Sequence, residues 1–278
     1  MYRSVDFSAG ATSAGRSGIR HAILSCMQWS GQAVIEPGRL IYRGRLGTAH
    51  HHAHAAVQIA VATDATPLLF TDARGQRASA LAGIIPAGTA HALDAADTTG
   101  LMVYLEPTTS AGRLVSALVD KQTRASCSSW TTAAATLSPN SAVQEHLSDA
   151  ADAVLRTLLG HTRTSAAPDE FVHPGVQQVV ALIPQLITGP IRLTEMAAAV
   201  YLSPDRLGRL FARDVGLSLS AYVRWARLIR TMEVARGGGT ITDAAHAAGF
   251  SDSSHANRAF HEMFGIAPIS AFRGVNLQ

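Results

Sequence analysis

Five histidines and a glutamine lie in two short stretches of the sequence and are the side chains best suited to chemistry. Residues 50–54 read His-His-His-Ala-His, Gln58 follows, and His91 ends the stretch Pro-Ala-Gly-Thr-Ala-His. Imidazole groups can bind transition metals, exchange a proton near neutral pH, or form hydrogen bonds inside a ligand pocket. The residue types by themselves leave all three roles open.

The histidines fall in a part of the sequence that predicts short β-strands. Between residues 39 and 106, short apolar or alternating stretches recur about every ten residues, separated by Gly, Pro and Asp, which is typical of a small sandwich or barrel. The stretches are 40–42, 57–61, 68–71, 83–88, 91–93 and 101–105.

An amphipathic helix is predicted over residues 140–160, because apolar residues recur every three or four positions. The stripe either packs on the barrel of its own chain or pairs with the same helix of a second chain as a homodimer, and the pattern leaves both open. Residues 161–175, rich in Thr, Ser and Pro, predict a linker. The residues of the stripe are Val143, Leu147, Ala151, Val154 and Leu158.

The last hundred residues repeat themselves at an offset of 49: Phe211 aligns with Phe260, and Gly216 with Gly265. Each unit reads as an Ala-rich helix, a short turn, and a second helix that ends before a glycine. The order helix, tight turn, helix at this length predicts a helix-turn-helix. Everything after residue 175 is expected to be helical, with a kink at Pro184.

The second helix of each unit has a polar face that could contact DNA. Residues 176–278 contain 10 basic and 7 acidic residues, whereas residues 1–175 contain 13 of each, so the positive excess lies in this region. Arginine can grip guanine and asparagine can pair with adenine. Solvated helix faces are the alternative, but the repeat and the charge favour DNA. The candidate DNA-binding residues are Asp205, Arg206, Arg209, Ser253, Ser254, Asn257 and Arg258.

Residues 190–273 resemble the DNA-binding region of AraC/XylS-type transcription regulators. The resemblance implies two helix-turn-helix units in one chain, joined by a long helix and entering successive major grooves of double-stranded DNA. Two positions depart from the family pattern: Tyr201 stands where the first turn usually has glycine, and Gly208 where a base-reading side chain is common. The matching stretches are 191–197, 202–211, 215–217, 247–252, 258–260, 264–268 and 272–273.

The spacing of the histidines resembles the cupin pattern, a His-x-His with an acidic or amide residue four positions on, then Pro-x-Gly-x-x-His. In cupin enzymes the matching residues bind a divalent metal, and sensor domains of AraC-type regulators are often cupin-like barrels. Gln58 replaces the usual glutamate, which removes a negative ligand. No cofactor is required by this interpretation, and a divalent metal is the one group it suggests. The matching positions are His52, His54, Gln58 and His91; with Tyr104 they are also the candidate effector-binding residues at the barrel mouth.

The sequence therefore predicts an all-β cupin-like barrel, a helical linker, and an all-α double helix-turn-helix domain. The expected boundaries are an unassigned segment 1–35, an effector domain 36–120, a linker 121–174 and a DNA-binding domain 175–278. The predicted function is a cytoplasmic, non-enzymatic transcription regulator that binds DNA and responds to a small-molecule effector.

Two other functions remain open from the sequence. A metal-dependent cupin enzyme would need an acid or base near the histidines, and only the distant Glu36 and Asp94 are available. A helical adaptor would use the C-terminal units for protein contact. The sequence has two cysteines, at no metal-ligand spacing, which argues against a disulfide scaffold. It has no apolar run approaching the roughly 20 residues of a membrane span, which argues against a membrane protein.

Overall fold

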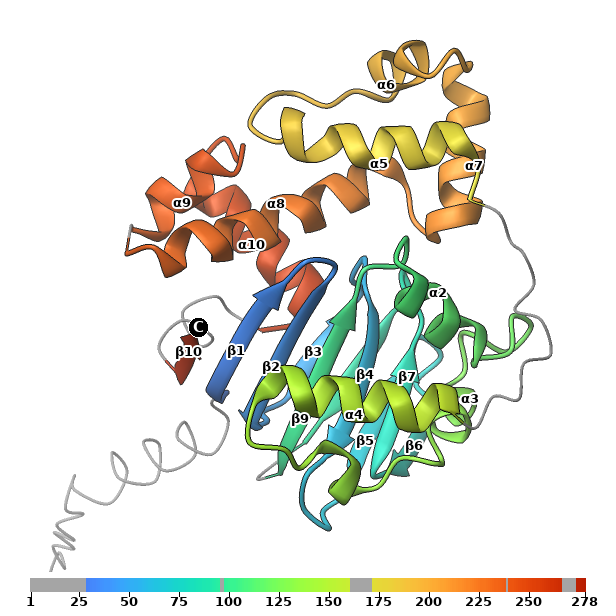
Figure 1. Cartoon of the computed structure of the whole chain (residues 1–278), viewed down its shortest axis with the longest axis vertical. Helices are drawn as coiled ribbons and strands as arrows, with labels where there is room; N and C mark the ends of the chain where they lie inside the picture. Colours follow the sequence, from blue (N-terminus) through green and yellow to red (C-terminus); the bar gives the residue numbers. More distant parts are fainter. Residues whose placement is uncertain (1–28, 96–97, 161–171, 239, 267–273) are drawn as a thin grey trace, which may run out of the picture.

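The computed structural model describes residues 29–95, 98–160, 172–238, 240–266 and 274–278. It shows an N-terminal β-sandwich with a group of C-terminal helices at one end (Figure 1). Among the described residues, no helix combines the length and the apolar character needed to cross a membrane.

The sandwich consists of two sheets that stay separate, so the predicted barrel is present as an open form. All neighbouring strands are antiparallel except β1 and β10. The first sheet has the order β10 (Val275–Leu277), β1 (Ser30–Glu36), β2 (Arg39–Arg45), β9 (Thr99–Leu105), β4 (Val57–Ala62) and β7 (Ala82–Ile85). The second has the order β3 (Ala49–His52), β8 (His91–Asp94), β5 (Leu68–Asp72) and β6 (Arg77–Ala80).

The central strands are buried along their whole length, as expected for continuous apolar stretches. Every residue of β4 is buried, and β9 is buried from Gly100 to Leu105. The predicted strands all form. Strand β1, however, falls mostly inside the segment 1–35 that was left unassigned, so the sandwich includes residues from at least Ser30 and the boundary at 36 is wrong.

Most of the predicted linker packs on the sandwich. Helices α2 (Ser110–Ala117), α3 (Cys127–Ala133) and α4 (Leu147–Gly160), with the 3-10 turn η1 (Pro139–Ala142), cover the sheets (Figure 1). Segment 121–160 therefore belongs to the N-terminal unit. Residues 161–171 of the predicted linker lie outside the described residues.

Helix α4 buries its apolar stripe against its own chain, the first of the two alternatives. Leu147, Ala151, Val154 and Leu158 are buried, and Arg39 of β2 donates a hydrogen bond to Asp152. A homodimer formed through the same stripe would require α4 to leave the sheet. The helix also starts later than predicted, at Leu147 and not at residue 140. Val143, the first residue of the predicted stripe, precedes it and is 59% exposed.

The C-terminal helices repeat one unit twice, as predicted. The first unit contains α6 (Leu193–Ala199) and α7 (Pro204–Val215); the second contains α9 (Ile241–Ala247) and α10 (Ser253–Phe264). Helix α5 (Pro174–Leu186), which keeps Pro184 inside it, precedes them, and α8 (Leu219–Arg236) joins them. Ser203 and Asp252 cap the two second helices, which end at left-handed Gly216 and Gly265.

The repeat has two registers, not the single one predicted. The second helices are related by 49 residues, but the turns before them are related by 48, because Tyr201 and Gly249 are the positive-φ residues of the two turns. The second unit has one additional residue, Ser251, between the turn and the cap. The predicted pairing of the first helices is therefore wrong by one position.

The turn at Tyr201 keeps the glycine geometry, at a cost in strain. Tyr201 has φ 56° and is 97% exposed, so it gains no burial in return. We expect Tyr201→Gly to stabilise the protein by roughly 1 kcal/mol, because glycine has no Cβ to clash in this conformation. Denaturant unfolding of the full chain measures the change. Tyr201→Ala, which keeps a Cβ, should give no comparable gain; an equal gain would show that tyrosine removal, and not strain relief, is responsible.

The end of the chain returns to the sandwich, which corrects the prediction of an all-helical C-terminal region. Strand β10 pairs in parallel with β1, and the Gln278 backbone N–H donates to the Ala33 carbonyl at 2.8 Å. Arg236, at the end of α8, donates to the Gln278 carbonyl at 3.0 Å. The second helix-turn-helix unit is thus connected to the N-terminal sheet at its far end.

Candidate nucleic-acid interface and histidine cluster

The seven predicted DNA-binding residues lie on α7 and α10, on the faces turned away from the core. All are exposed except Ser253, which is half-buried. The opposite faces pack inward through Leu207 and Phe211 on α7 and through Ala259 and Phe260 on α10. The two helices therefore present polar faces of the kind that a recognition helix requires.

The arginines of these faces differ in their partners. Arg209 lies 2.8 Å from Asp205, four residues earlier on α7, and both side chains are more than three-quarters exposed. Such a pair contributes little to stability in water, so the guanidinium can exchange Asp205 for a nucleic-acid group. Arg206 and Arg258 are exposed and have no ion-pair partner within 4 Å in the described part of the chain.

The arginines of the connecting helix α8 serve the protein itself, which the sequence did not indicate. Arg227 donates to the carbonyls of Ile187 at 3.1 Å and Gly189 at 2.6 Å, and burial lowers the pKa of its guanidinium. Arg224 pairs with Glu262 of α10 at 3.3 Å. These contacts hold the two units on α8 and leave less of its charge for DNA.

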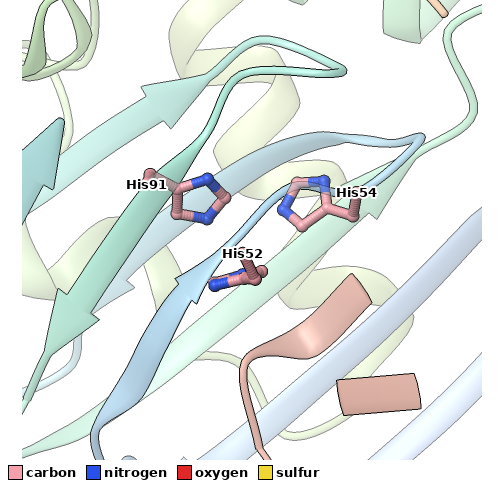
Figure 2. A group of neighbouring side chains, drawn as sticks. All are labelled: His52, His54 and His91. Carbon is pink, nitrogen blue, oxygen red and sulfur yellow. The ribbon is translucent and has the colours of Figure 1, made fainter. Parts of the chain in front are cut away.

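The histidine cluster brings together residues from two strands and a loop. His52 ends β3, His91 begins β8, and His54 lies in the loop between β3 and β4. Figure 2 shows the three rings facing a common centre, and one ring nitrogen from each lies within 4.8 Å of the others. All three are buried, whereas His50 and His51 are exposed, as expected for solvated neighbours.

Backbone carbonyls fix the tautomer of each ring. The Nδ1 atoms of His52, His54 and His91 lie 2.7, 2.8 and 2.8 Å from the carbonyl oxygens of residues 50, 56 and 89. A carbonyl only accepts hydrogen bonds, so each Nδ1 carries the proton and each Nε2 keeps its lone pair. This is the arrangement of metal-binding histidines, whose second nitrogen is held by an acceptor.

Gln58 completes the cluster. Its Oε1 lies 2.8 Å from Nε2 of His54 and 3.2 Å from Nε2 of His91. The Nε2 lone pairs of His54 and His91 would then face the amide oxygen of Gln58, which is itself an acceptor. Three changes relieve this repulsion: a bound cation, a second proton on the rings, or a reversed Gln58 amide whose NH₂ donates to both rings. Burial disfavours the second proton: it lowers the pKa of all three rings, that of His52 to about 3.

These residues fit a divalent metal. Three imidazole nitrogens with one amide oxygen suit a borderline ion such as Zn²⁺, Co²⁺ or Ni²⁺ better than Mg²⁺ or Ca²⁺, which prefer oxygen ligands. The predicted ligand set of His52, His54, Gln58 and His91 is thus assembled in one place. Glu36 and Asp94, the acids considered for an enzyme, instead contact Ser148 and Thr48 respectively.

Tyr104, the fifth predicted effector residue, lies beside the cluster and lines a separate cavity. Its ring centroid is 5.3 Å from that of His54. The cavity, of about 80 Å³, is apolar and lies between the sandwich and the second helix-turn-helix unit. Trp29, which also lines it, has a buried indole N–H with no hydrogen-bond partner among the residues that the structure describes. Its other residues include Tyr42, Met232, Phe260, Phe264 and Leu277, which are too scattered in sequence to be found by pattern.

The C-terminal region is similar to domains of known proteins. Residues 196–274 match the family model of a helix-turn-helix domain. The HTH-type transcriptional regulator GbdR of Pseudomonas aeruginosa is 34% identical over 102 residues, which are 36% of this chain and 28% of GbdR. The HTH-type transcriptional activator RhaR of Pectobacterium atrosepticum is 35% identical over 88 residues, 31% of each chain. This region is an AraC-type helix-turn-helix domain. The chain spans less than a third of the length of either relative.

The whole architecture also has a counterpart. A crystal structure of an apo ToxT variant from Vibrio cholerae superimposes with a TM-score of 0.55 over 85% of this chain and 96% of that chain, at 10% identity. The likeness is one of fold: a β-rich N-terminal unit followed by helices. The AraC-type domain thus follows an N-terminal unit of the shape predicted from the strand pattern.

Both departures of the AraC-type domain from its family pattern are visible in the structure. Tyr201 adopts the left-handed conformation of the glycine it replaces, so the turn keeps its shape. Gly208 is half-buried on α7, and a Cβ there would lie 3.5 Å from the Leu193 side chain, an ordinary van der Waals distance. A side chain could be accommodated at this position, so its absence is not forced by packing.

Proposed function

We propose that the protein is a sequence-specific, DNA-binding transcription regulator whose two helix-turn-helix units contact neighbouring major grooves. One observation carries this: α7 and α10 each begin at a side-chain N-cap and end at a left-handed glycine, bury equivalent apolar faces, and expose polar faces that each contain arginine. The relatives of the AraC-type domain are named as transcriptional regulators or activators.

The test is binding of the full chain to its own upstream DNA, with genome-wide recovery of bound fragments to find further sites. The double variant Arg206→Ala/Arg258→Ala should lose affinity, because each change removes a cation from one recognition helix. Arg74→Ala, on the exposed turn between β5 and β6, is the matched control and should bind normally. Full affinity in the double variant, or no DNA binding by the wild type at low salt, would contradict the proposal.

Arg258 and Arg209 are expected to differ in what they contribute. Arg258→Ala should reduce discrimination between the preferred site and a site with a changed guanine by about 1–3 kcal/mol if Arg258 reads that base. Arg209→Ala should cost less, because Arg209 must first release Asp205. Competition binding with single-base variants of the site measures both. An equal loss on all sequences would show that Arg258 contacts phosphate.

We also propose that the apolar cavity beside Tyr104 receives the effector, a small apolar molecule with one hydrogen-bond acceptor. The N–H of Trp29, which meets no acceptor within the described part of the chain, and the surrounding aromatic rings support this class of ligand. A related crystal structure is described as unsaturated fatty acid bound ToxT. Screening short aliphatic and aromatic acids by thermal shift tests the proposal; Met232→Trp, which fills the cavity, should abolish any shift, and an unchanged shift would place the ligand elsewhere.

The buried histidines favour a regulatory role over an enzymatic one. His54 and His91 are 1% and 0% exposed, and the C-terminal end of α10 lies against His52. A substrate would have to displace this helix end to reach the cluster. The three clustered imidazoles are a candidate metal site, and an activity lost in His91→Ala would restore the enzyme alternative.

A further inference from the structure

The C-terminal end of α10 is docked on the strand that carries His52. The His50 backbone N–H donates to the Gly265 carbonyl at 3.0 Å, and the Ala53 N–H donates to the Glu262 carbonyl at 3.3 Å. Contact is so close that a Cβ at Gly265 would lie 2.4 Å from the His50 carbonyl oxygen and 2.7 Å from Nδ1 of His52. The end of this recognition helix therefore cannot shift independently of the histidine strand.

The C-terminal end of α7 is docked on the loop that leads to His91. A Cβ at Gly88 would lie 2.8 Å from the Gly216 carbonyl oxygen and 2.8 Å from the Leu217 side chain. Gly88 in turn donates its N–H to the His54 carbonyl at 2.8 Å. The other recognition helix thus ends against a second segment next to the same cluster.

The two docking points are equivalent in the internal repeat. Gly216 and Gly265 are separated by 49 residues, and both are left-handed caps of recognition helices. Between them, Trp225 of α8 lies with its ring centroid 6.2 Å from that of His54. The histidine cluster therefore lies next to α8, the helix that joins the two units and sets the separation of α7 and α10.

We propose that a divalent transition metal held by His52, His54, His91 and Gln58 sets the relative placement of the two recognition helices and so controls DNA binding. The inference rests on the proposed function. A metal draws imidazole nitrogens to about 2.0–2.1 Å from one centre, which places them roughly 3.3 Å apart in a tetrahedral site. Here one ring nitrogen from each histidine lies within 4.8 Å of the others, so ligation would draw the rings closer together and pull on the segments against which both helices end.

Such control has a thermodynamic consequence. Metal can shift the helix arrangement only if it binds the two arrangements with different affinity. If metal changes DNA affinity by some factor, DNA must change metal affinity by the same factor, and couplings of this kind are typically about 5- to 150-fold. The reciprocity can be measured with the full chain.

Metal binding is tested first, with Co²⁺ alone as the probe. The wild-type chain should bind one Co²⁺ with visible absorption bands that saturate at one equivalent. His91→Ala should remove the bands, and His51→Ala, an exposed neighbour, should keep them. Absence of the bands in the wild type would overturn the metal site without involving DNA.

Helix placement is tested with spin labels at Ala212→Cys and His261→Cys, which are exposed, equivalent positions on α7 and α10. Cys26→Ser removes one native thiol, and Cys127 is buried. Adding Zn²⁺ should shift or narrow the measured distance distribution, and the same additions should leave His91→Ala unchanged. An unchanged distribution in a chain that binds Co²⁺ would overturn the coupling.

Gly265→Ala separates the coupling from DNA binding itself. Its Cβ should displace α10 from β3, so DNA affinity should change less than twofold on adding metal, against at least about fivefold in the wild type. Gly75→Ala is the matched control, because it has a similar φ of +77° but open space around it. Wild-type DNA affinity unaffected by Zn²⁺ overturns this proposal alone. If the wild-type chain binds no DNA with or without metal, the proposed function is overturned instead. The Co²⁺ absorption and the spin-label distances still report on the metal site in that case.

Discussion

DNA binding by the full chain is expected to weaken steeply as salt rises. Arg206, Arg209 and Arg213 lie on one side of α7, and Arg258 lies on α10. Each phosphate neutralised by such a residue contributes a slope of about −0.9 to the plot of log affinity against log salt concentration, because bound counterions are released. Four contacts give a slope of about −3.6, so a fourfold rise in salt should reduce affinity about 150-fold.

Fluorescence anisotropy of labelled operator DNA across a NaCl series measures this slope. The double variant Arg206→Ala/Arg258→Ala should lower its magnitude by about 2, whereas Arg74→Ala should not alter it. Affinity that does not respond to salt would contradict phosphate contact by these arginines. It would support the alternative in which the helices contact another protein.

Trp130→Ala is expected to cost about 3–5 kcal/mol in the free energy of unfolding of the N-terminal unit. Trp130 is among the largest fully buried side chains of the described residues, and its indole N–H donates to the Arg124 carbonyl at 2.7 Å. Truncation leaves a large cavity beside β7 and a buried carbonyl without its donor.

Denaturant unfolding with a chelator present measures this cost without any contribution from bound metal. Trp130→Phe keeps most of the packing and loses the hydrogen bond, so it should cost clearly less. A cost under about 1 kcal/mol for Trp130→Ala would mean that the site collapses around the smaller side chain.

Local patterns determined most of the secondary structure. The strands containing Val57–Val61 and Leu101–Leu105 could be predicted because apolar runs of strand length, bounded by turn residues, have few other solutions. The end of the first recognition helix before Gly216 could be predicted as well, because glycine readily adopts the left-handed conformation that ends a helix. The helix at 140–160 was predicted too long, since periodicity does not show where a chain stops following it, and Val143 precedes the helix.

The sequence did not predict which part of the molecule each element or side chain contacts. The stripe of α4 was compatible with a second chain or with its own sheet, because periodicity describes a face and not what covers it. Arg227 carries the same charge as Arg258 in the sequence, yet it holds the carbonyls at the end of α5. The return of Val275–Leu277 to β1 depends on backbone hydrogen bonds between distant segments, which leave little trace in three residues.

The sequence by itself determined the two recognition helices, the strands of the sandwich, and the identity of the four cluster residues, because each follows from short-range spacing or from a motif. Only the tertiary structure decided that the three imidazoles converge beside Gln58, and that both helix caps rest on the segments carrying them. The reason is physical. Spacing fixes which side of an element a residue occupies, whereas the distance between residues 52 and 265 depends on how the sandwich and the second helix-turn-helix unit pack into one shared core.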